Sequence, residues 1–254
     1  VQLEYKIGPF SYDLWVSSKD LAIEFSGLRR QHSKQLDVEK WENAVRNNIN
    51  YLMIFEDEWR DRNDQIKTLI KNKLNLTKYK SLRPSKCEIK LIGKKEADMF
   101  LNSYHYIGKA LAPINYGVYF EDKLIACCCF KHPTRQSTHD WEIVRMTSHP
   151  EYKVHGIWSK LFKLFMEEHA GCSIVSFSDN RIFNGEVYKK MGFKYDGSVR
   201  PDYYWVKSSK RFHKSALRKT RLEKLTGKTE SVLREAQGYT KIWDLGKKRW
   251  IFKF

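Results

Sequence analysis

The chain has 254 residues, of which 41% are hydrophobic and 14% aromatic, which is enough to bury one or two cores and excludes a largely disordered protein. Lys and Arg number 47 against 30 Asp and Glu, and the resulting net charge of +17 favours a polyanionic partner such as double-stranded DNA. No segment reaches the roughly 18 apolar residues of a transmembrane helix, so no membrane partner is expected.

The first sixty residues predict a hairpin, a crossover helix and a third strand. Phe10–Val16 and Leu21–Phe25 are short apolar strands on either side of a turn. Asp37–Asn47 carries its apolar residues on one helical face, and Tyr51–Phe55 is a continuous apolar run typical of a buried strand. A further amphipathic helix is expected at about 61–76, which would close a first module at residue 77.

A second module is expected over residues 87–206, after a basic linker at 78–86 that contains a proline. Its expected hairpin strands are 115–120 and 124–130, its further strands are 141–146 and 173–177, and its expected helices include 155–165 and 185–190. Residues 207–254 predict a basic C-terminal extension that ends in a terminal hairpin.

Five cysteines, three of them consecutive at 127–129, form no Cys-x-x-Cys pair with zinc-binding spacing. Consecutive residues of a strand point to opposite faces, so buried reduced thiols are expected. Reduced thiols indicate a cytoplasmic protein, in the host cytoplasm if the protein is encoded by a phage. The start on Val1 without a secretory signal pattern suggests that the natural beginning of the protein is missing.

Asp13 and Glu24 are acidic residues within the two apolar strands of the predicted hairpin. A carboxylate among apolar neighbours costs free energy unless it meets a cation, and two carboxylates on facing strands can share one. Mg²⁺ prefers oxygen ligands, and a bound Mg²⁺ activates water for attack on phosphorus. The alternative is a half-buried strand whose acidic side faces water.

Three short segments resemble a known set of nucleases. They are Tyr12–Val16, Leu21–Leu28 with His32 and Ser33 after it, and Tyr51–Trp59, which contains Ile-Phe-Glu-Asp-Glu-Trp. Over residues 8–60 the chain resembles phage homing endonucleases related to the very-short-patch repair (Vsr-like) nucleases, within the restriction-endonuclease-like (PD-(D/E)XK-type) fold. The resemblance implies hydrolysis of DNA phosphodiester bonds with Mg²⁺ (or Mn²⁺).

The resemblance also implies roles for individual residues. Asp13 and Glu24 would hold the metal ion, and His32 would act as general acid or base. Glu56 or Asp57 would complete the catalytic site.

The sequence departs from the family at the catalytic histidine. The family reads Gly-Leu-Tyr-Trp-His-Ser where this chain has Gly-Leu-Arg-Arg-Gln-His-Ser, so either Gln31 or His32 fills that position. Ser26 stands where related nucleases carry a lysine. A DNA-binding protein with a decayed nuclease centre is therefore an alternative.

The second module resembles the GNAT N-acyltransferases. Asn184–Phe193 is similar to the helix-then-Gly-Phe signature of that family, and Val154–Phe162 stands at its Gly-rich pyrophosphate loop. There, backbone N–H groups at a helix N-terminus bind the pyrophosphate of acetyl-CoA, which requires small residues. Only Gly156 and Ser159 are small here, while Trp158 is bulky, so the loop looks degraded. The module is then either an active acyltransferase or a fold reused for DNA contact or stability.

Basic residues recur between 207 and 228. Such a run is either a solvated helix face or a surface that contacts DNA phosphates. The expected DNA-binding residues are Arg29, Arg30, Lys34, Lys210, Arg211, Lys214, Arg218, Lys219 and Arg221.

Together these patterns predict an α/β protein with a restriction-endonuclease-like nuclease module at 1–77, a GNAT-like mixed α/β domain at 87–206 and a basic C-terminal extension. The predicted function is a metal-dependent DNA endonuclease. The alternatives are a GNAT-type acyltransferase acting on nucleic acid or protein, and a DNA-binding protein without nuclease activity. No oligomeric state is predicted.

Overall fold

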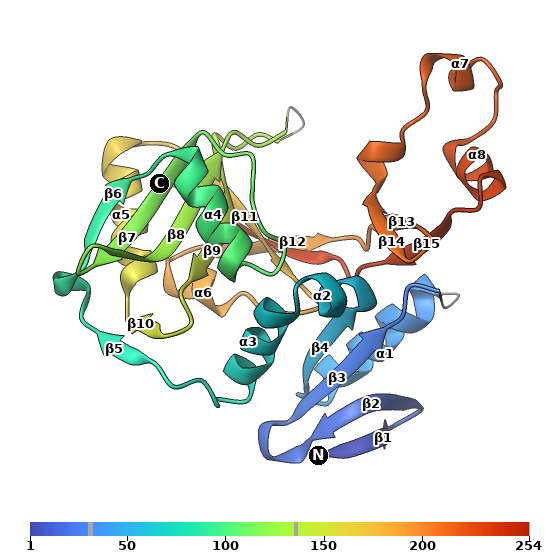
Figure 1. Ribbon diagram of the computed structural model, residues 1–254, viewed down its shortest axis with the longest axis horizontal. Coiled ribbons are helices and arrows are strands. Elements are labelled where there is room, and N and C mark those ends of the chain that lie inside the picture. Colours follow the sequence, from blue (N-terminus) through green and yellow to red (C-terminus); the bar gives the residue numbers. More distant parts are fainter. Residues whose placement is uncertain (30–32, 135–136, 254) are drawn as a thin grey trace. The chain divides into compact units, whose positions relative to one another are not determined.

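The structure, a computed structural model, describes residues 1–29, 33–134 and 137–253, and it divides into two compact units (Figure 1). Unit 1 comprises Val1–Asn63, Asp179–Ile182 and Val199–Lys247, and unit 2 comprises Asp64–Ser178, Phe183–Ser198 and Lys248–Phe254. Each unit therefore combines stretches that lie far apart in the sequence.

Unit 1 contains a four-stranded sheet in the order β1-β2-β3-β4. Its elements in chain order are β1 (Gln2–Ile7), β2 (Phe10–Val16), η1 (Ser17–Lys19), β3 (Leu21–Ser26), α1 (Lys34–Arg46), β4 (Asn50–Phe55) and α2 (Glu56–Asp61). The antiparallel β2–β3 hairpin and the crossover to a parallel β4 are confirmed. Ser33 begins α1 because its hydroxyl accepts a hydrogen bond from the N–H of Leu36.

A second, three-stranded sheet of unit 1 has the order β14-β13-β15. Its strands are β13 (Tyr203–Lys207), β14 (Lys210–His213) and β15 (Thr240–Trp243). Tyr12 and Phe55 of the first sheet form one buried cluster with Val206 and Ile242 of the second, so the two sheets share a core. Between β14 and β15 lies an arm, residues 214–239, which contains η3 (Lys214–Leu217), α7 (Arg221–Lys224) and α8 (Glu230–Ala236).

Unit 2 is built on a seven-stranded sheet in the order β12-β16-β11-β9-β8-β7-β6. The strands of this sheet are β6 (Glu88–Leu91), β7 (Ile114–Phe120), β8 (Lys123–Lys131), β9 (Trp141–Ser148), β11 (Ile174–Asp179), β12 (Lys194–Val199) and β16 (Lys247–Phe252). The sheet is mixed, since β6 to β9 pair antiparallel and β9 pairs parallel with β11.

Unit 2 also contains helices and short strands outside this sheet. They are α3 (Asn63–Lys73), β5 (Lys80–Leu82), η2 (Pro84–Lys86), α4 (Lys94–Tyr104), β10 (Tyr152–Val154), α5 (Ile157–Glu168) and α6 (Glu186–Lys190). The short strands β5 and β10 pair parallel with each other.

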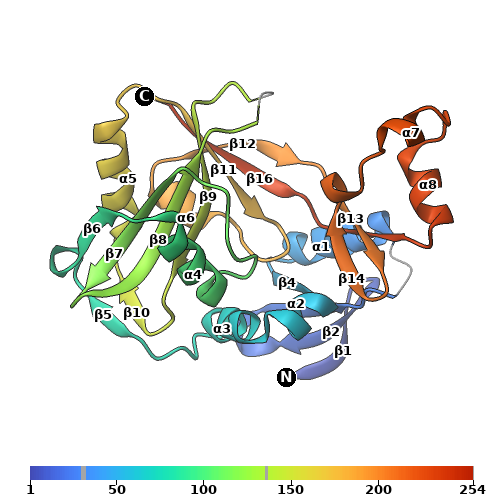
Figure 2. The same ribbon diagram turned by 45° about the horizontal axis from the view of Figure 1, so that its top comes forward.

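The three consecutive cysteines show why β8 is apolar throughout. Cys128 packs into the core cluster that contains Phe165 of α5, whereas Cys127 and Cys129 pack with Phe100 of α4. Figure 2 shows α4 and α5 on opposite faces of the sheet, so each cysteine meets a helix. All five cysteines are free; Cys87 and Cys127–Cys129 are buried, as predicted, whereas Cys172 is only half-buried.

The predicted terminal hairpin is wrong. Thr240–Trp243 pairs with β13 in the three-stranded sheet, whereas Lys247–Phe252 lies between β12 and β11 in the seven-stranded sheet. Trp250 explains the second placement, because its ring is 2% exposed and its Nε1–H donates to Ser178 Oγ at 2.9 Å. None of the helices in the described ranges is long and apolar enough to span a membrane.

Candidate functional site

The structure brings the two predicted metal ligands, Asp13 and Glu24, side by side on β2 and β3. The N–H of Asp13 donates to Glu24 Oε1 at 3.0 Å, and the N–H of Phe25 donates to Asp13 Oδ2 at 2.7 Å. Lys40 Nζ of α1 lies 2.6 Å from Glu24 Oε1. Burial raises the pKa of Glu24, and the Lys40 ammonium opposes that rise. Backbone N–H groups and an ammonium therefore satisfy both carboxylates.

The acidic residues after β4 are also paired. Glu56 Oε2 accepts a hydrogen bond from the N–H of Leu28 at 2.8 Å. Asp57 Oδ2 lies 3.0 Å from Arg211 Nε. Burial raises the pKa of Asp57, while the guanidinium of Arg211 partly offsets this.

Glu58 lies at the centre of a buried ion network in unit 1. Its carboxylate lies 3.0 Å from both Arg181 and Arg211, and Arg181 also binds Asp179 at 2.9 Å. The Phe55 ring lies 4.3 Å from the guanidinium of Arg181 and 4.4 Å from that of Arg211. Burial alone would raise the pKa of Glu58, but the two guanidinium groups lower it below its ordinary value. The network is a structural element of unit 1.

The prediction of a Mg²⁺ (or Mn²⁺) site is wrong. Over residues 1–29, 33–134 and 137–253, no group of three or more His, Cys, Asp and Glu side chains could hold a metal ion. The oxygens expected to bind the ion instead bind N–H groups, Lys40 and Arg211. His32 and its alternative, Gln31, lie outside the described residues.

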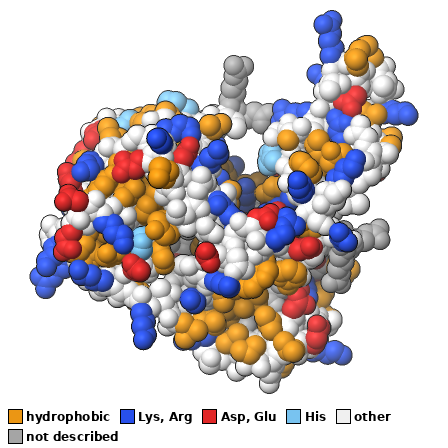
Figure 3. Space-filling model, viewed as in Figure 1, with side chains coloured by type: hydrophobic (Ala, Val, Ile, Leu, Met, Phe, Trp, Pro, Cys, Tyr) orange, Lys and Arg blue, Asp and Glu red, His pale blue; other side chains and the backbone are white. Residues whose placement is uncertain are grey.

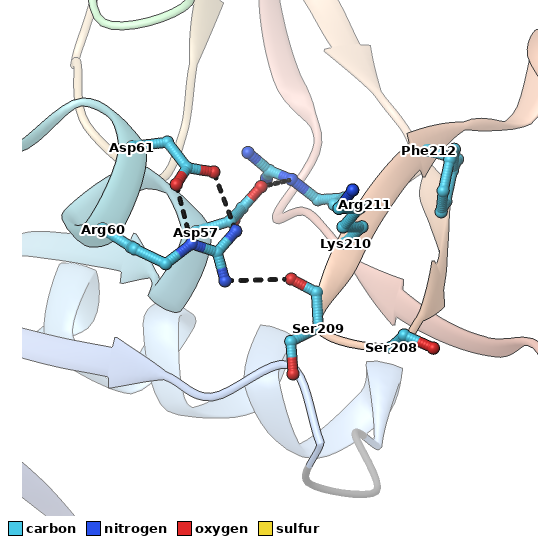
Figure 4. A pocket seen from close by; sticks show the side chains of 8 residues that line it. All are labelled: Asp57, Arg60, Asp61, Ser208, Ser209, Lys210, Arg211 and Phe212. Atoms are coloured by element: carbon cyan, nitrogen blue, oxygen red, sulfur yellow. Dashed lines mark hydrogen bonds and ion pairs between the residues drawn. The ribbon is translucent and has the colours of Figure 1, made fainter.

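A hollow of about 420 Å³ lies between α2 and the turn that joins β13 to β14 (Figure 4). Arg60 of α2 reaches across it, since Nη1 donates to Ser209 O at 3.1 Å while Nε pairs with Asp61 at 2.7 Å. Lys210 and the Arg211–Asp57 pair complete the charged lining. Because cations and carboxylates alternate around it, the hollow does not present a single sign of charge to a ligand.

The predicted DNA-binding residues differ in their surroundings. Lys214 pairs with Asp202 at 2.6 Å, and Lys34 Nζ lies 4.9 Å from the centroid of the Trp243 ring. Arg30 lies outside the described residues. The residues that face solvent are Arg29, Lys34, Lys210, Arg218 and Arg221, whereas Arg211, Lys214 and Lys219 are half-buried. Binding of DNA by these side chains stays a prediction.

In unit 2, helix α5 begins with open backbone N–H groups. Gly156 precedes the helix with a φ of +78°, and a Cβ placed on it would have nothing within 4 Å. The N–H groups of Ile157, Trp158 and Ser159 lie in the first helical turn and have no acceptor within the helix. Trp158, expected from the sequence to obstruct this loop, packs against the core of unit 2 instead. The start of α5 therefore offers N–H groups to an anion.

Strand β9 parts from β11 halfway along its length. The parallel pairing covers Trp141–Ile143 of β9, although β9 continues to Ser148. On the other side, β9 pairs with β8 as far as Ser148, and the register shift there leaves Val144 as an extra residue. Bulges of this kind recur next to active sites because they re-aim a strand. Beyond Ile143, β9 is therefore no longer paired with β11.

Ser176 and Tyr188 lie at the last paired position before this opening. Ser176 Oγ lies 2.9 Å from Ile143 O and 2.8 Å from the Tyr188 hydroxyl, and its single proton can serve only one of these two contacts at a time. Burial raises the pKa of Tyr188 to about 12, although the bond to Ser176 acts in the other direction. The hydroxyl of Tyr188 therefore keeps its proton near neutral pH.

The segment after α4 was not singled out from the sequence, yet it is held against β9. Arg145 Nε donates to Gly108 O at 3.3 Å. The N–H of Ile107 donates to His105 Nδ1 at 3.1 Å. The rings of His105 and Tyr106 stack at 4.9 Å. The adjacent aromatic residues before a glycine are a signal that could have pointed to this segment.

The mixed sheet with helices on both faces defines unit 2 as a mixed α/β protein. Residues 86–254, more than half of the chain, match the family model of the Mom protein family. The chain belongs to the Mom protein family. Among curated proteins, no relative matches.

Solved acetyltransferase structures resemble part of the chain. A Bacillus subtilis acetyltransferase in complex with CoA has 12% identity and a TM-score of 0.39, over 66% of this chain and 99% of that one. A GNAT family acetyltransferase from Elizabethkingia anophelis with acetyl-CoA bound has 11% identity and a TM-score of 0.38, with the same coverage of 66% and 99%. For a Bacillus anthracis acetyltransferase in complex with acetyl coenzyme A, the identity is 16% and the TM-score 0.33, over 56% of this chain and 62%, less than two thirds, of that one.

The prediction of a metal-dependent DNA endonuclease is wrong. The matching family is the Mom protein family, and the described residues include no group of His, Cys, Asp and Glu side chains that could hold the metal ion. No comparison supports a restriction-endonuclease-like module at 1–77. The mixed α/β fold expected for the second module is confirmed.

Proposed function

We propose that the protein modifies nucleic acid by transferring an acyl group from an acyl-CoA thioester. The Mom protein family groups phage modification proteins, and the net charge of +17 favours a polyanionic substrate. The observation that carries the proposal is a pair of features in unit 2. Helix α5 begins with N–H groups that have no acceptor within the helix, and strand β9 stops pairing with β11 after Ile143.

The residues at these two places suit a CoA thioester. Gly156 and Ser159 are exposed and small, so a pyrophosphate can approach the N–H groups at the start of α5. Beyond Ile143, β9 no longer pairs with β11, and the amides of the pantetheine chain would lie along this part of the strand. When bound, the thioester supplies an activated carbonyl carbon. Tyr188, whose hydroxyl stays protonated, can donate a hydrogen bond at the last rung of the β9–β11 pairing.

The acceptor must be a nucleophile that nucleic acid presents. The exocyclic amines of the bases are such groups. Acylation forms an N–C(O) bond and breaks the C–S bond of the thioester, and the proton lost by the amine converts the leaving thiolate into the CoA thiol. Substitution on a base also alters nucleic acid without breaking its backbone. We therefore infer base acylation as the reaction class.

The first experiment measures CoA binding with a matched pair of glycine variants. Gly156 and Gly171 both have a φ of +78°, and a Cβ added to either would meet nothing within 4 Å, so Gly156→Ala and Gly171→Ala carry the same backbone cost. We expect Gly156→Ala to weaken CoA binding about tenfold, equivalent to about 1.4 kcal/mol, and Gly171→Ala to leave it unchanged. Calorimetric titration with CoA measures both.

The second experiment measures the reaction itself. Plasmid DNA is incubated with radiolabelled acetyl-CoA and the protein, and digested nucleosides are analysed by mass spectrometry. Label in a modified nucleoside supports the proposal. Absence of CoA binding at millimolar concentration, or equal weakening by the two alanine variants, would overturn it.

A further inference from the structure

The arm of unit 1 exposes two leucines at its outer end. Leu222 is 77% and Leu225 81% exposed, and both lie in or directly after α7. Figures 1 and 2 show α7 as the part of the arm farthest from the three-stranded sheet. Large apolar side chains exposed together on a folded element indicate a contact surface.

The exposure does not result from a loose arm. Arg234 of α8 is 5% exposed, and its guanidinium binds Glu223 at 2.6 Å and the carbonyl oxygen of Leu217 at 2.8 Å. Thr220 and Glu223 form a reciprocal capping box at the start of α7. Lys219 Nζ donates to Lys228 O at 2.9 Å and closes the tip. These bonds hold α7, and with it the two leucines, in a fixed place on the arm.

Cations surround the leucines. Over residues 218–229 the only acidic side chain is Glu223, which is already paired with Arg234. The basic residues of the same stretch are Arg218, Lys219, Arg221, Lys224 and Lys228. Figure 3 shows Lys and Arg side chains around exposed hydrophobic ones at the outer end of the arm. The tip thus combines an apolar pair with a strong excess of positive charge.

Double-stranded DNA is the partner that this combination fits best. A base inside a duplex is stacked and out of reach, and enzymes that modify bases take them out of the stack. Proteins that open base steps insert apolar side chains such as Leu and hold the flanking phosphates with Arg and Lys. We propose that the arm binds duplex DNA, with its cations on phosphates and with Leu222 and Leu225 inserted between base pairs. This inference rests on the proposed function in so far as the substrate is nucleic acid.

The test measures base stacking directly. The full chain is titrated into a duplex containing 2-aminopurine, whose fluorescence rises when it leaves the stack, with no CoA compound present. We expect the parent protein to raise the fluorescence severalfold and the double variant Leu222→Ser/Leu225→Ser to lose most of this rise. The matched control is Leu36→Ser/Val45→Ser on α1 of the same unit, where the side chains are 58% and 48% exposed. The control should retain the rise, and all variants should keep the parent Tm.

The role of the cations is measured separately through the salt dependence of DNA binding. Each phosphate contact contributes a slope of about −0.9 to log K against log salt. Replacement of Arg221, Lys224 and Lys228 by Gln should therefore reduce the slope by about two to three. The serine variants should leave the slope unchanged, because they remove no charge.

Three results would overturn the proposal. They are equal fluorescence from the leucine variant and its control, an unchanged salt slope in the glutamine variant, and binding of the parent to phosphatidylglycerol vesicles but not to DNA. The two proposals fail separately. Unstacking without acyl transfer would reject the proposed function alone, and acyl transfer to duplex DNA without unstacking would reject the role of the arm alone.

Discussion

Gly185, at the start of α6, is a position where a single added carbon should be costly. Its φ is +88°, and a Cβ placed there would lie 2.1 Å from Cζ2 of Trp250. The indole cannot easily withdraw, because it is 2% exposed and its Nε1–H binds Ser178 Oγ at 2.9 Å. Gly185→Ala therefore combines backbone strain of about 1–2 kcal/mol with overpacking of about 1–3 kcal/mol.

The expected loss of stability for Gly185→Ala is thus about 2–5 kcal/mol, or a Tm lower by about 4–20 °C. Gly171→Ala is the control, because Gly171 has a φ of +78° with nothing within 4 Å and so lacks the overpacking. Circular dichroism during heating gives both values. If the two variants have the same Tm, Trp250 does not pack on Gly185, and the placement of β16 inside the seven-stranded sheet is refuted.

Three further predictions concern paired or buried groups. Arg181→Met leaves buried carboxylates short of a partner and should reduce stability by about 3–5 kcal/mol in urea unfolding; a change below 1 kcal/mol would contradict the network. Tyr188→Phe should slow acyl transfer without changing CoA affinity, while Tyr116→Phe, also buried, should change neither; equal rates for both variants would contradict the role of Tyr188. The Arg234 guanidinium lowers the pKa of Glu223 from 4.5 to about 2, so the pair stabilises the arm fully above pH 4.5 and loses this effect as the pH falls through about 2. Limited pepsin digestion between pH 2 and 5 should therefore cut the arm only near the lower limit.

Local patterns predicted most elements because their hydrophobic period is set by neighbours in the chain. The hairpin of β2 and β3 and the apolar strand β8 follow from alternation and from the turns that flank them. Local patterns do not, however, determine which sheet a strand joins. Trp243 and Lys247 are separated by three residues but lie in different sheets.

The turn between these two strands explains the difference. Gly246 has a φ of +72°, and a Cβ there would lie 2.3 Å from the carbonyl oxygen of Val199. Asp244 Oδ1 accepts hydrogen bonds from the N–H groups of Asp202 and Gly246 at 2.7 and 2.9 Å. These partners are distant in the sequence, so local spacing predicted a hairpin where the chain passes from one sheet to another.

Only part of the candidate site could be predicted from the sequence. Gly156 and the segment around Tyr188 stood out in the sequence because glycine and aromatic positions form a recognisable motif. The opening between β9 and β11 did not, because it depends on where the pairing of two strands stops and on a bulge at Val144. Register of this kind is set by packing on both faces of the sheet, which no single stretch of sequence reports.

The error at Asp13 and Glu24 has a physical cause that also bears on the arm. The premise that a carboxylate in an apolar strand needs a positive partner was sound, but the partners are N–H groups and Lys40. With 47 basic and 30 acidic side chains, an acidic group in this chain finds an ammonium or guanidinium more readily than a metal ion. The same imbalance leaves cations without acidic partners, and residues 218–229 carry five of them beside one acid that Arg234 already neutralises. Basic side chains that do not pair with acidic ones within the fold are available to bind the phosphates of DNA. We therefore assign a ligand to the arm of unit 1 and not to its hairpin.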